Sequence, residues 1–273
     1  MKNCLYCCLL IALCLCEPAY GQLSGFMPST MNVAGIAAAR TDRWSAFHNP
    51  ASLVQQAAWQ VAVQYENRYL TAELSTEMIQ AAYCNDYVNV GVAYSFFGYG
   101  KYSEMMAGIT LARRFADRFS LGLQADLIAV YCGDDVGYKL TGIPQIGATV
   151  DITANLTLGI ETFNPFIQSL PVNEQQIKLP AIYTIATDYR FYKGLRWDAE
   201  VSYNTLENFR VATGFEWQAI EQLCIKLGAY YQQYIIGNLG VGLTFKDLSI
   251  DINAHWHPVL GVQLATKVGY SWQ

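Results

Sequence analysis

Apolar and polar side chains alternate with a period of two along most of this chain. The clearest case is residues 260–272, where one face carries Leu260, Val262, Leu264, Thr266, Val268, Tyr270 and Trp272. The opposite face carries small or polar side chains, namely Gly261, Gln263, Ala265, Lys267, Gly269 and Ser271. Residues 195–204, 208–218, 235–246 and 248–257 follow the same pattern. A period of two with one apolar face is typical of β-strands and not of helices.

The chain contains about fourteen such segments, most of them close to ten residues long. A strand of that length, tilted, crosses the hydrocarbon core of a bilayer. The expected strands are 59–67, 70–82, 87–97, 102–114, 118–131, 143–154, 155–163, 180–192, 195–204, 208–218, 222–232, 235–246, 248–257 and 260–272. An even number of strands places both ends of a barrel on the same side of the membrane.

Aromatic residues gather at the ends of these segments, where a membrane barrel needs girdles at the two lipid–water interfaces. One expected rim consists of Trp59, Phe119, Trp217 and Trp272. The other consists of Tyr65, Phe96, Tyr131, Tyr203, Tyr231 and Trp256. Soluble β-sandwiches also alternate, but their strands are shorter and lack paired aromatic rims. We therefore predict an all-β fold, a transmembrane antiparallel β-barrel of about 14 strands.

The first residues have the features of a secretory signal peptide. A basic Lys2 precedes an apolar run at 5–15, and small residues at Ala19 and Gly21 fit a cleavage site after Gly21. A lipoprotein with lipid on Cys16 is the alternative, although Leu15 stands where a small residue is expected. The expected location is therefore the outer membrane of a Gram-negative cell, after removal of residues 1–21.

Residues 22–56 precede the first strand and are expected to form an N-terminal plug, followed by the barrel at 57–273. A barrel of this size encloses a lumen too wide for wall side chains alone to fill. The expected plug residues are Trp44, Phe47, His48, Asn49 and Pro50. Trp44 and Phe47 are expected to seal the lumen, and Asn49 to hold the following bend through a backbone hydrogen bond. Trp44 and Phe47 would share one face of a helical turn, and Pro50 would then bend the chain into the first strand.

Composition and charge exclude several classes of protein. The net charge of −5 is not that of a nucleic-acid-binding protein. Five of the eight cysteines leave with the signal peptide, and the remaining Cys84, Cys132 and Cys224 have neither disulfide nor metal-site spacing. Charged residues are only 14% and tyrosine is abundant, at 19 residues, which suits a chain that meets lipid as well as water.

The connections between strands alternate in length, which indicates an orientation. Tight turns at 85–86, 116–117, 154–155, 193–194, 221 and 246–247 are expected on the periplasmic side. The two longest connections, 132–142 and 164–179, are expected outside the cell.

The polar groups expected to line the lumen include Asp251, Asn253, His255, His257 and Lys267. The two histidines share one strand face and, with Asp251 and Asn253, form a conceivable metal set. The favoured interpretation is lumen polarity and contact with the plug, so no metal or other cofactor is predicted. Further inward charges are expected at Glu66, Glu73, Glu77, Asp126, Asp151, Glu161, Arg190, Arg196, Arg210 and Lys226. The chain has no Gly-x-Ser-x-Gly elbow or similar nucleophile motif, so an enzyme is not expected.

Residues 37–53, read with the pattern above, resemble a known group. Their sequence of small residues, then Asp42, Trp44, Asn-Pro-Ala at 49–51 and Leu53 is similar to the N-terminal element of FadL-like outer-membrane proteins. That group includes fatty-acid and hydrocarbon channels, and PorV/PorQ barrels associated with protein secretion. Residues 257–261, before the last strand, resemble the PorV/PorQ branch. The fatty-acid channels are much longer and have larger extracellular loops, so fatty-acid transport is not carried over.

Two functions follow from the resemblance. The first is passive transport of hydrophobic small molecules through a plugged lumen. The alternative is a non-transporting component of a protein secretion or surface-assembly system. The expected partners are outer-membrane lipid and either hydrophobic small molecules or a secretion-system protein, with no nucleic acid.

Overall fold

The computed structural model describes residues 25–27, 32–40, 47–55, 58–133, 137–172 and 175–272. The expected signal peptide, its cleavage site and Trp44 lie outside these ranges. No helix in the described ranges is long and apolar enough to cross a membrane.

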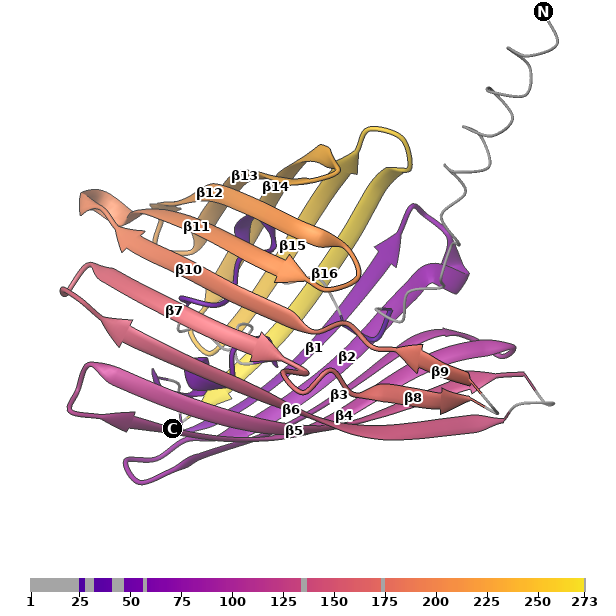
Figure 1. The fold of residues 1–273 in the computed structure, drawn as a ribbon. Helices are drawn as coiled ribbons and strands as arrows, with labels where there is room; N and C mark the ends of the chain where they lie inside the picture. The colour runs from indigo at the N-terminus through magenta and orange to yellow at the C-terminus, as the bar shows by residue number, and fades with distance from the viewer. Residues whose placement is uncertain are drawn as a thin grey trace, which may run out of the picture.

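Within the described part of the chain, fourteen antiparallel strands close into one barrel (Figure 1). They are β1 (Trp59–Arg68), β2 (Ser75–Tyr83), β3 (Asn89–Tyr99), β4 (Tyr102–Phe115), β5 (Phe119–Cys132), β6 (Tyr138–Asp151), β7 (Leu156–Phe163), β10 (Ile182–Arg190), β11 (Leu195–Asn204), β12 (Asn208–Ile220), β13 (Leu223–Gln232), β14 (Tyr234–Phe245), β15 (Leu248–His257) and β16 (Gly261–Trp272). The barrel closes where β1 pairs with β16, with Trp59 opposite Trp272. The prediction of an all-β barrel of 14 strands is therefore confirmed.

The two connections expected to be longest differ from the expected boundaries. β6 begins at Tyr138, which pairs with Tyr131, so the connection expected at 132–142 is shorter than predicted. The region expected as a loop at 164–179 contains a separate hairpin, β8 (Ser169–Val172) and β9 (Gln175–Lys178). Residues 138–142 pair with residues 127–131 of β5, and this backbone pairing extends β6 beyond its expected start.

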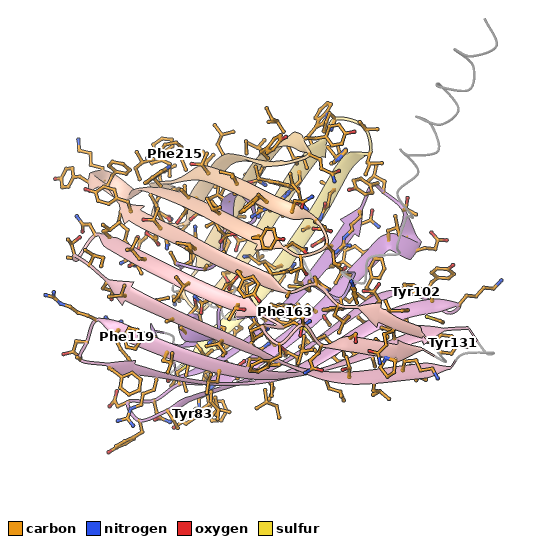
Figure 2. All side chains as sticks on the ribbon, viewed as in Figure 1. Tyr83, Tyr102, Phe119, Tyr131, Phe163 and Phe215 are labelled. Atoms are coloured by element: carbon orange, nitrogen blue, oxygen red, sulfur yellow. The ribbon has the colours of Figure 1, made fainter. Side chains whose placement is uncertain are left out.

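The outer face of the wall is apolar and carries aromatic residues toward both ends. Figure 2 places Phe119 and Tyr83 toward one end of the barrel and Tyr131 toward the other. At the barrel seam, the rings of Trp59 and Trp272 stack with their centroids 6.3 Å apart. These rings lie where a membrane barrel meets the lipid headgroups. The faces predicted for the C-terminal strand are confirmed, because Val268 and Tyr270 are exposed whereas Lys267 and Gly269 are buried.

Short 3₁₀ helices complete the fold. η1 (Val33–Gly35) and η3 (Pro50–Gln55) precede the first strand, while η4 (Ala72–Leu74) and η5 (Tyr192–Gly194) lie in connections between strands. η3 begins at Pro50, whereas the sequence predicted that Pro50 would end a helical turn. Proline is well suited to the first position of a helix because its φ is preset and its missing N–H has no helical partner there.

Candidate functional site in the barrel lumen

The N-terminal residues that the structure describes, 25–27, 32–40 and 47–55, lie inside the barrel, and we call them the lumenal segment. η1 contacts β12, β13 and β14, while η3 contacts β3, β4, β5 and β6 on the other side of the lumen. The wall carries glycines where this segment comes closest. A Cβ on Gly122, Gly147 or Gly159 would overlap residues 49–51 or 38–39 of the segment. Glycine permits such close approach of two backbones.

Asn49 connects the two halves of the lumenal segment. Its Oδ1 accepts a hydrogen bond from the Ala51 N–H at 2.9 Å, which forms the turn into η3. Its Nδ2 donates to the Ala38 carbonyl at 2.5 Å and lies 3.5 Å from the carbonyl oxygen of Ile160 in β7. Ser52 Oγ donates to the Arg40 carbonyl at 2.5 Å. The side chains of Asn49 and Ser52 are fully buried, so these bonds replace contacts with water.

One half of the lumen holds the segment by charge. Arg40 donates from Nη1 to Asp198 at 2.7 Å and from Nη2 to Glu216 at 2.8 Å. Lys226 lies 3.7 Å from Glu216 and 2.5 Å from Asp251, so the network continues from β11 to β15. The Arg40 side chain is only 5% exposed, and buried charges of this kind are tolerated only when they are paired.

The same half also binds main-chain N–H groups of the segment. Glu200 Oε2 accepts hydrogen bonds from the Ala37 and Ala38 N–H groups at 2.9 and 3.1 Å. Asn238 Oδ1 accepts from the Ala34 N–H at 2.9 Å, and Arg210 donates to the Ala34 carbonyl. Carboxylate acceptors make stronger hydrogen bonds than neutral ones, so this half fixes the path of residues 34–38 in the lumen.

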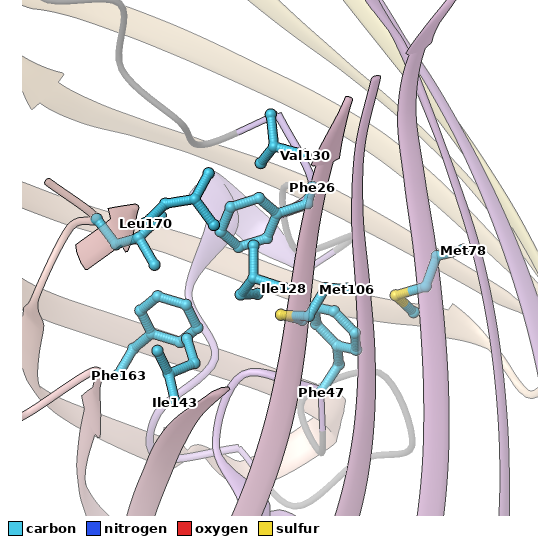
Figure 3. Close-up of a cluster of buried hydrophobic side chains, with 10 residues drawn as sticks. Phe26, Phe47, Met78, Met106, Ile128, Val130, Ile143, Phe163 and Leu170 are labelled. Atoms are coloured by element: carbon cyan, nitrogen blue, oxygen red, sulfur yellow. The ribbon is translucent and has the colours of Figure 1, made fainter. Parts of the chain in front are cut away.

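The opposite half of the lumen holds a cluster of apolar side chains. β2, β4, β5, β6 and β7 each turn apolar side chains inward there, and Figure 3 shows these side chains clustered around Phe26 and Phe47 of the lumenal segment. The buried members of this apolar cluster are Phe26, Phe47, Met78, Met106, Ile128, Val130, Ile143, Phe163, Leu170 and Leu179. Leu170 belongs to the β8–β9 hairpin, so the hairpin adds to the cluster.

The cavity between the segment and the wall is small at the end of the barrel that holds Trp59 and Trp272. A cavity of about 20 Å³ lies among Phe47, Leu53, Gln60, Thr110 and Gln124. Such a volume holds about one water molecule. The space beside Phe47 is therefore too small for an organic solute.

The predicted lumen residues of β15 and β16 are placed as follows. Asp251 pairs with Lys226, and Asn253 and Lys267 are buried on the inner face. His255 is buried against the Tyr230 ring, 5.8 Å away. His257 lies at the rim, where its Nδ1 accepts hydrogen bonds from the N–H groups of residues 259 and 260 at 3.2 and 3.0 Å. No group of three or more His, Cys, Asp or Glu side chains among the described residues is arranged to hold a metal ion.

The predictions that Glu73 and Glu77 point into the lumen are wrong. Glu73 lies in η4 and is exposed, and Glu77 points out of the barrel beside Tyr65. The expected strand began at residue 70, but η4 delays β2 until Ser75, and Met78 and Ile79 are both apolar. Alternation therefore did not fix which face of β2 was inward. Glu66, Asp126, Asp151, Glu161, Arg196, Arg210, Lys226 and Lys267 are on the lumenal face as predicted, and Arg190 extends to the exposed end of that face.

Among the predicted plug residues, Phe47, Asn49 and Pro50 are buried, and His48 lies between them with partial exposure. Sequence reasoning missed Phe26 and Arg40. Phe26 donates a main-chain hydrogen bond to Glu104, and Arg40 forms ion pairs with Asp198 and Glu216. It also missed the inward apolar positions Ile128 and Val130. The run Leu-Ile-Ala-Val at 127–130 has apolar residues on both faces, which was a signal that the inner face is covered.

Comparison with solved structures identifies the fold. The chain is similar to a Pseudomonas aeruginosa FadL homologue, with a TM-score of 0.65, 15% identity, and coverage of 91% of this chain and 100% of the other. It is also similar to the Pseudomonas putida toluene transporter TodX, with a TM-score of 0.66, 10% identity and coverage of 92% and 97%. Acinetobacter baumannii Omp33 is more distant, with a TM-score of 0.52, 9% identity and coverage of 80% and 99%.

No known protein family profile and no curated protein sequence matches the chain. At these identities the likeness concerns the fold. The fold expected from the sequence resemblance, that of FadL-like outer-membrane barrels, is thereby shown.

Proposed function

We propose that this barrel is a passive outer-membrane channel for hydrophobic small molecules, closed by its lumenal segment. One observation carries the proposal: a buried cluster of apolar wall side chains is in contact with Phe26 and Phe47 of the segment that fills the lumen. A channel for polar solutes has a polar, water-filled interior. Apolar inward side chains offer no hydrogen bonds to polar solutes. They do lower the free energy of an apolar molecule that moves to them from water.

The structural neighbours agree with this proposal. One of them is described as a toluene transporter, and it shares this barrel at low sequence identity. The lumenal segment is the part that must move for a solute to pass, since it leaves room for about one water molecule beside Phe47. We infer that Phe47 and Trp44 contribute to the closure.

The test is uptake by liposomes that contain the mature chain. Replacing Trp44 and Phe47 by alanine, or deleting residues 24–50, should raise the uptake of an apolar dye, because these changes remove bulky side chains from the segment before β1. Phe215→Ala is the matched control, since Phe215 is exposed on the outer face. Entry of small sugars at the same rate as the dye would show that the segment only blocks a non-selective pore. A barrel that passes no apolar solute in any variant would contradict the channel.

A second candidate is a non-transporting component of a secretion or surface-assembly system. The observation that favours it is apolar exposure at turns of one rim: Leu70 and Val259 are 72% and 68% exposed. Exposed apolar side chains at a barrel rim can offer a partner protein a surface to contact. Under this function, the Trp44 and Phe47 variants leave uptake unchanged. Crosslinking in intact cells then recovers a membrane partner, and recovery falls when Leu70 and Val259 become serine.

A further inference from the structure

Residues 25–27 are bound through their main-chain atoms. The Phe26 N–H donates to Glu104 Oε2 at 3.2 Å, and Ser95 Oγ donates to the Phe26 carbonyl at 2.6 Å. Thr76 Oγ1 donates to the Gly25 carbonyl at 2.9 Å. Arg68 Nη2 lies 3.4 Å from the Gly25 carbonyl oxygen and 3.3 Å from that of Met27. Four strands, β1 to β4, therefore supply hydrogen-bond partners to three consecutive residues.

The side chains that form this site are themselves held in place. Glu104 is 2% exposed, and its Oε1 accepts a hydrogen bond from the Tyr102 hydroxyl at 2.6 Å. Arg68 donates from Nε to Glu66 at 2.9 Å. Ser95 and Thr76 are fully buried. A buried hydrogen-bonding group is costly without a partner, so the site favours a ligand that offers donors and acceptors at peptide spacing.

The Phe26 ring occupies the apolar cluster. Its centroid lies 6.2 Å from that of Phe163, and Met106, Ile128 and Val130 belong to the same buried cluster (Figure 3). The ring itself is fully buried. A phenyl group in such a pocket contributes much of the binding energy of a peptide, because it buries a large apolar area with few rotatable bonds.

The barrel wall leaves no room for a side chain at position 25. A Cβ on this residue would overlap the ring of Phe97. The Arg68 guanidinium carbon lies 5.2 Å from the centroid of that ring and restricts its movement. Any residue larger than glycine would therefore have to displace Phe97.

We propose that this end of the lumen is a peptide-recognition site, filled here by the chain's own residues 25–27. Its ligand is a short, neutral peptide segment with glycine, then phenylalanine, then an apolar residue. The four strands that form it meet at the end of the barrel opposite the C-terminus, so it is closest to the mouth that the turn lengths assign to the cell exterior. A segment of another protein with this pattern competes with residues 25–27. This inference goes beyond the channel and holds whether or not small molecules pass.

A hydrocarbon does not fit the site as well as a peptide. It would fill the ring pocket, but Glu104 Oε2, Ser95 Oγ, Thr76 Oγ1 and Arg68 Nη2 would lose the main-chain partners that residues 25–27 provide. Each such loss costs binding free energy, whereas a peptide satisfies all of them. An anionic ligand is also disfavoured, because the carboxylate of Glu104 lies at the point where the ligand has its N–H.

The experiment measures binding of acetyl-Gly-Phe-Met-amide with a fluorophore on a C-terminal linker, by anisotropy, to the full mature chain in detergent. Phe26→Ala and Gly25→Ala both weaken the binding of residues 25–27 in the site. The first removes the buried ring, and the second introduces an overlap with Phe97. Both variants should bind the probe at least about tenfold more tightly than the unmodified chain, because they raise the fraction of open sites. Heat-modifiable migration on gels shows whether each variant retains the folded barrel.

Two matched probes test the recognition. With Phe26→Ala, the Gly-Ala-Met probe should bind about tenfold or more weakly than the Gly-Phe-Met probe, for want of the ring. The Ala-Phe-Met probe should be weakened similarly, and adding Phe97→Ala should remove that difference. The proposal is overturned if both folded variants bind Gly-Phe-Met no more tightly than the unmodified chain does. It is also overturned if Ala-Phe-Met binds Phe26→Ala equally well.

Discussion

Replacing Arg40 by methionine is expected to detach the lumenal segment from the charged half of the wall. The substitution removes two charge-assisted hydrogen bonds, at 2.7 Å to Asp198 and 2.8 Å to Glu216. Breaking a buried ion pair by removing one partner costs about 3–5 kcal/mol. The lower end applies here, because Arg196 lies 3.6 Å from Asp198 and Lys226 lies 3.7 Å from Glu216, and both remain.

The assay is thiol labelling of a buried position in the segment. Val33 is fully buried in η1, and Val33→Cys adds no volume. In a background without the other cysteines, labelling by a maleimide then reports how often the segment leaves the wall. A loss of about 3 kcal/mol raises the population of the released state, and so the labelling rate, about a hundredfold. The barrel itself should keep its heat-modifiable migration.

A matched control and a double variant make the reasoning refutable. Arg190→Met changes the same residue type at the end of β10, but this arginine is 46% exposed and lies 3.7 Å from the carboxylate of Asp188. It should leave labelling unchanged. Asp198→Asn should accelerate labelling less in the Arg40→Met background than alone, because the two groups interact directly. Equal labelling rates for Arg40→Met and the unmodified arginine would show that the ion pairs do not hold the segment.

Three further outcomes are expected. Gly159→Ala should accelerate labelling of Val33→Cys, since its Cβ would overlap the backbone of the lumenal segment, whereas Gly142→Ala, on the outer face, should not. Cysteines at Asn173 and Asp247, in a background without others, should label oppositely in intact cells, Asn173→Cys outside; labelling of Asp247→Cys alone would reverse the orientation. Burial raises the pKa of Cys84 to about 11, so at pH 8 only about one thiol in a thousand is ionised. Iodoacetamide should therefore modify Cys84 slowly at pH 8 and faster as the pH rises toward 11; rapid modification of the folded barrel at pH 8 would refute this burial.

The sequence alone determined the number of barrel strands, most of their inner and outer faces, and the aromatic rims. Alternation is a local property, because successive side chains of a strand point to opposite sides whatever the strand pairs with. Lys267 was therefore placed inward and Trp272 outward without knowledge of the tertiary structure. Where an element intervened, as η4 does before β2, the same rule failed for Glu77.

The tertiary structure alone decided what the lumen contains and which groups meet in it. Arg40 reaches Asp198 and Glu216 across 158 and 176 positions of the chain. Phe26 meets Glu104 across 78. These partners are set by the register and closure of the barrel, which bring distant strands around one interior. A local pattern carries no information on such pairs, so the site at Gly25 and Phe26 is visible only when the lumenal segment lies in its barrel.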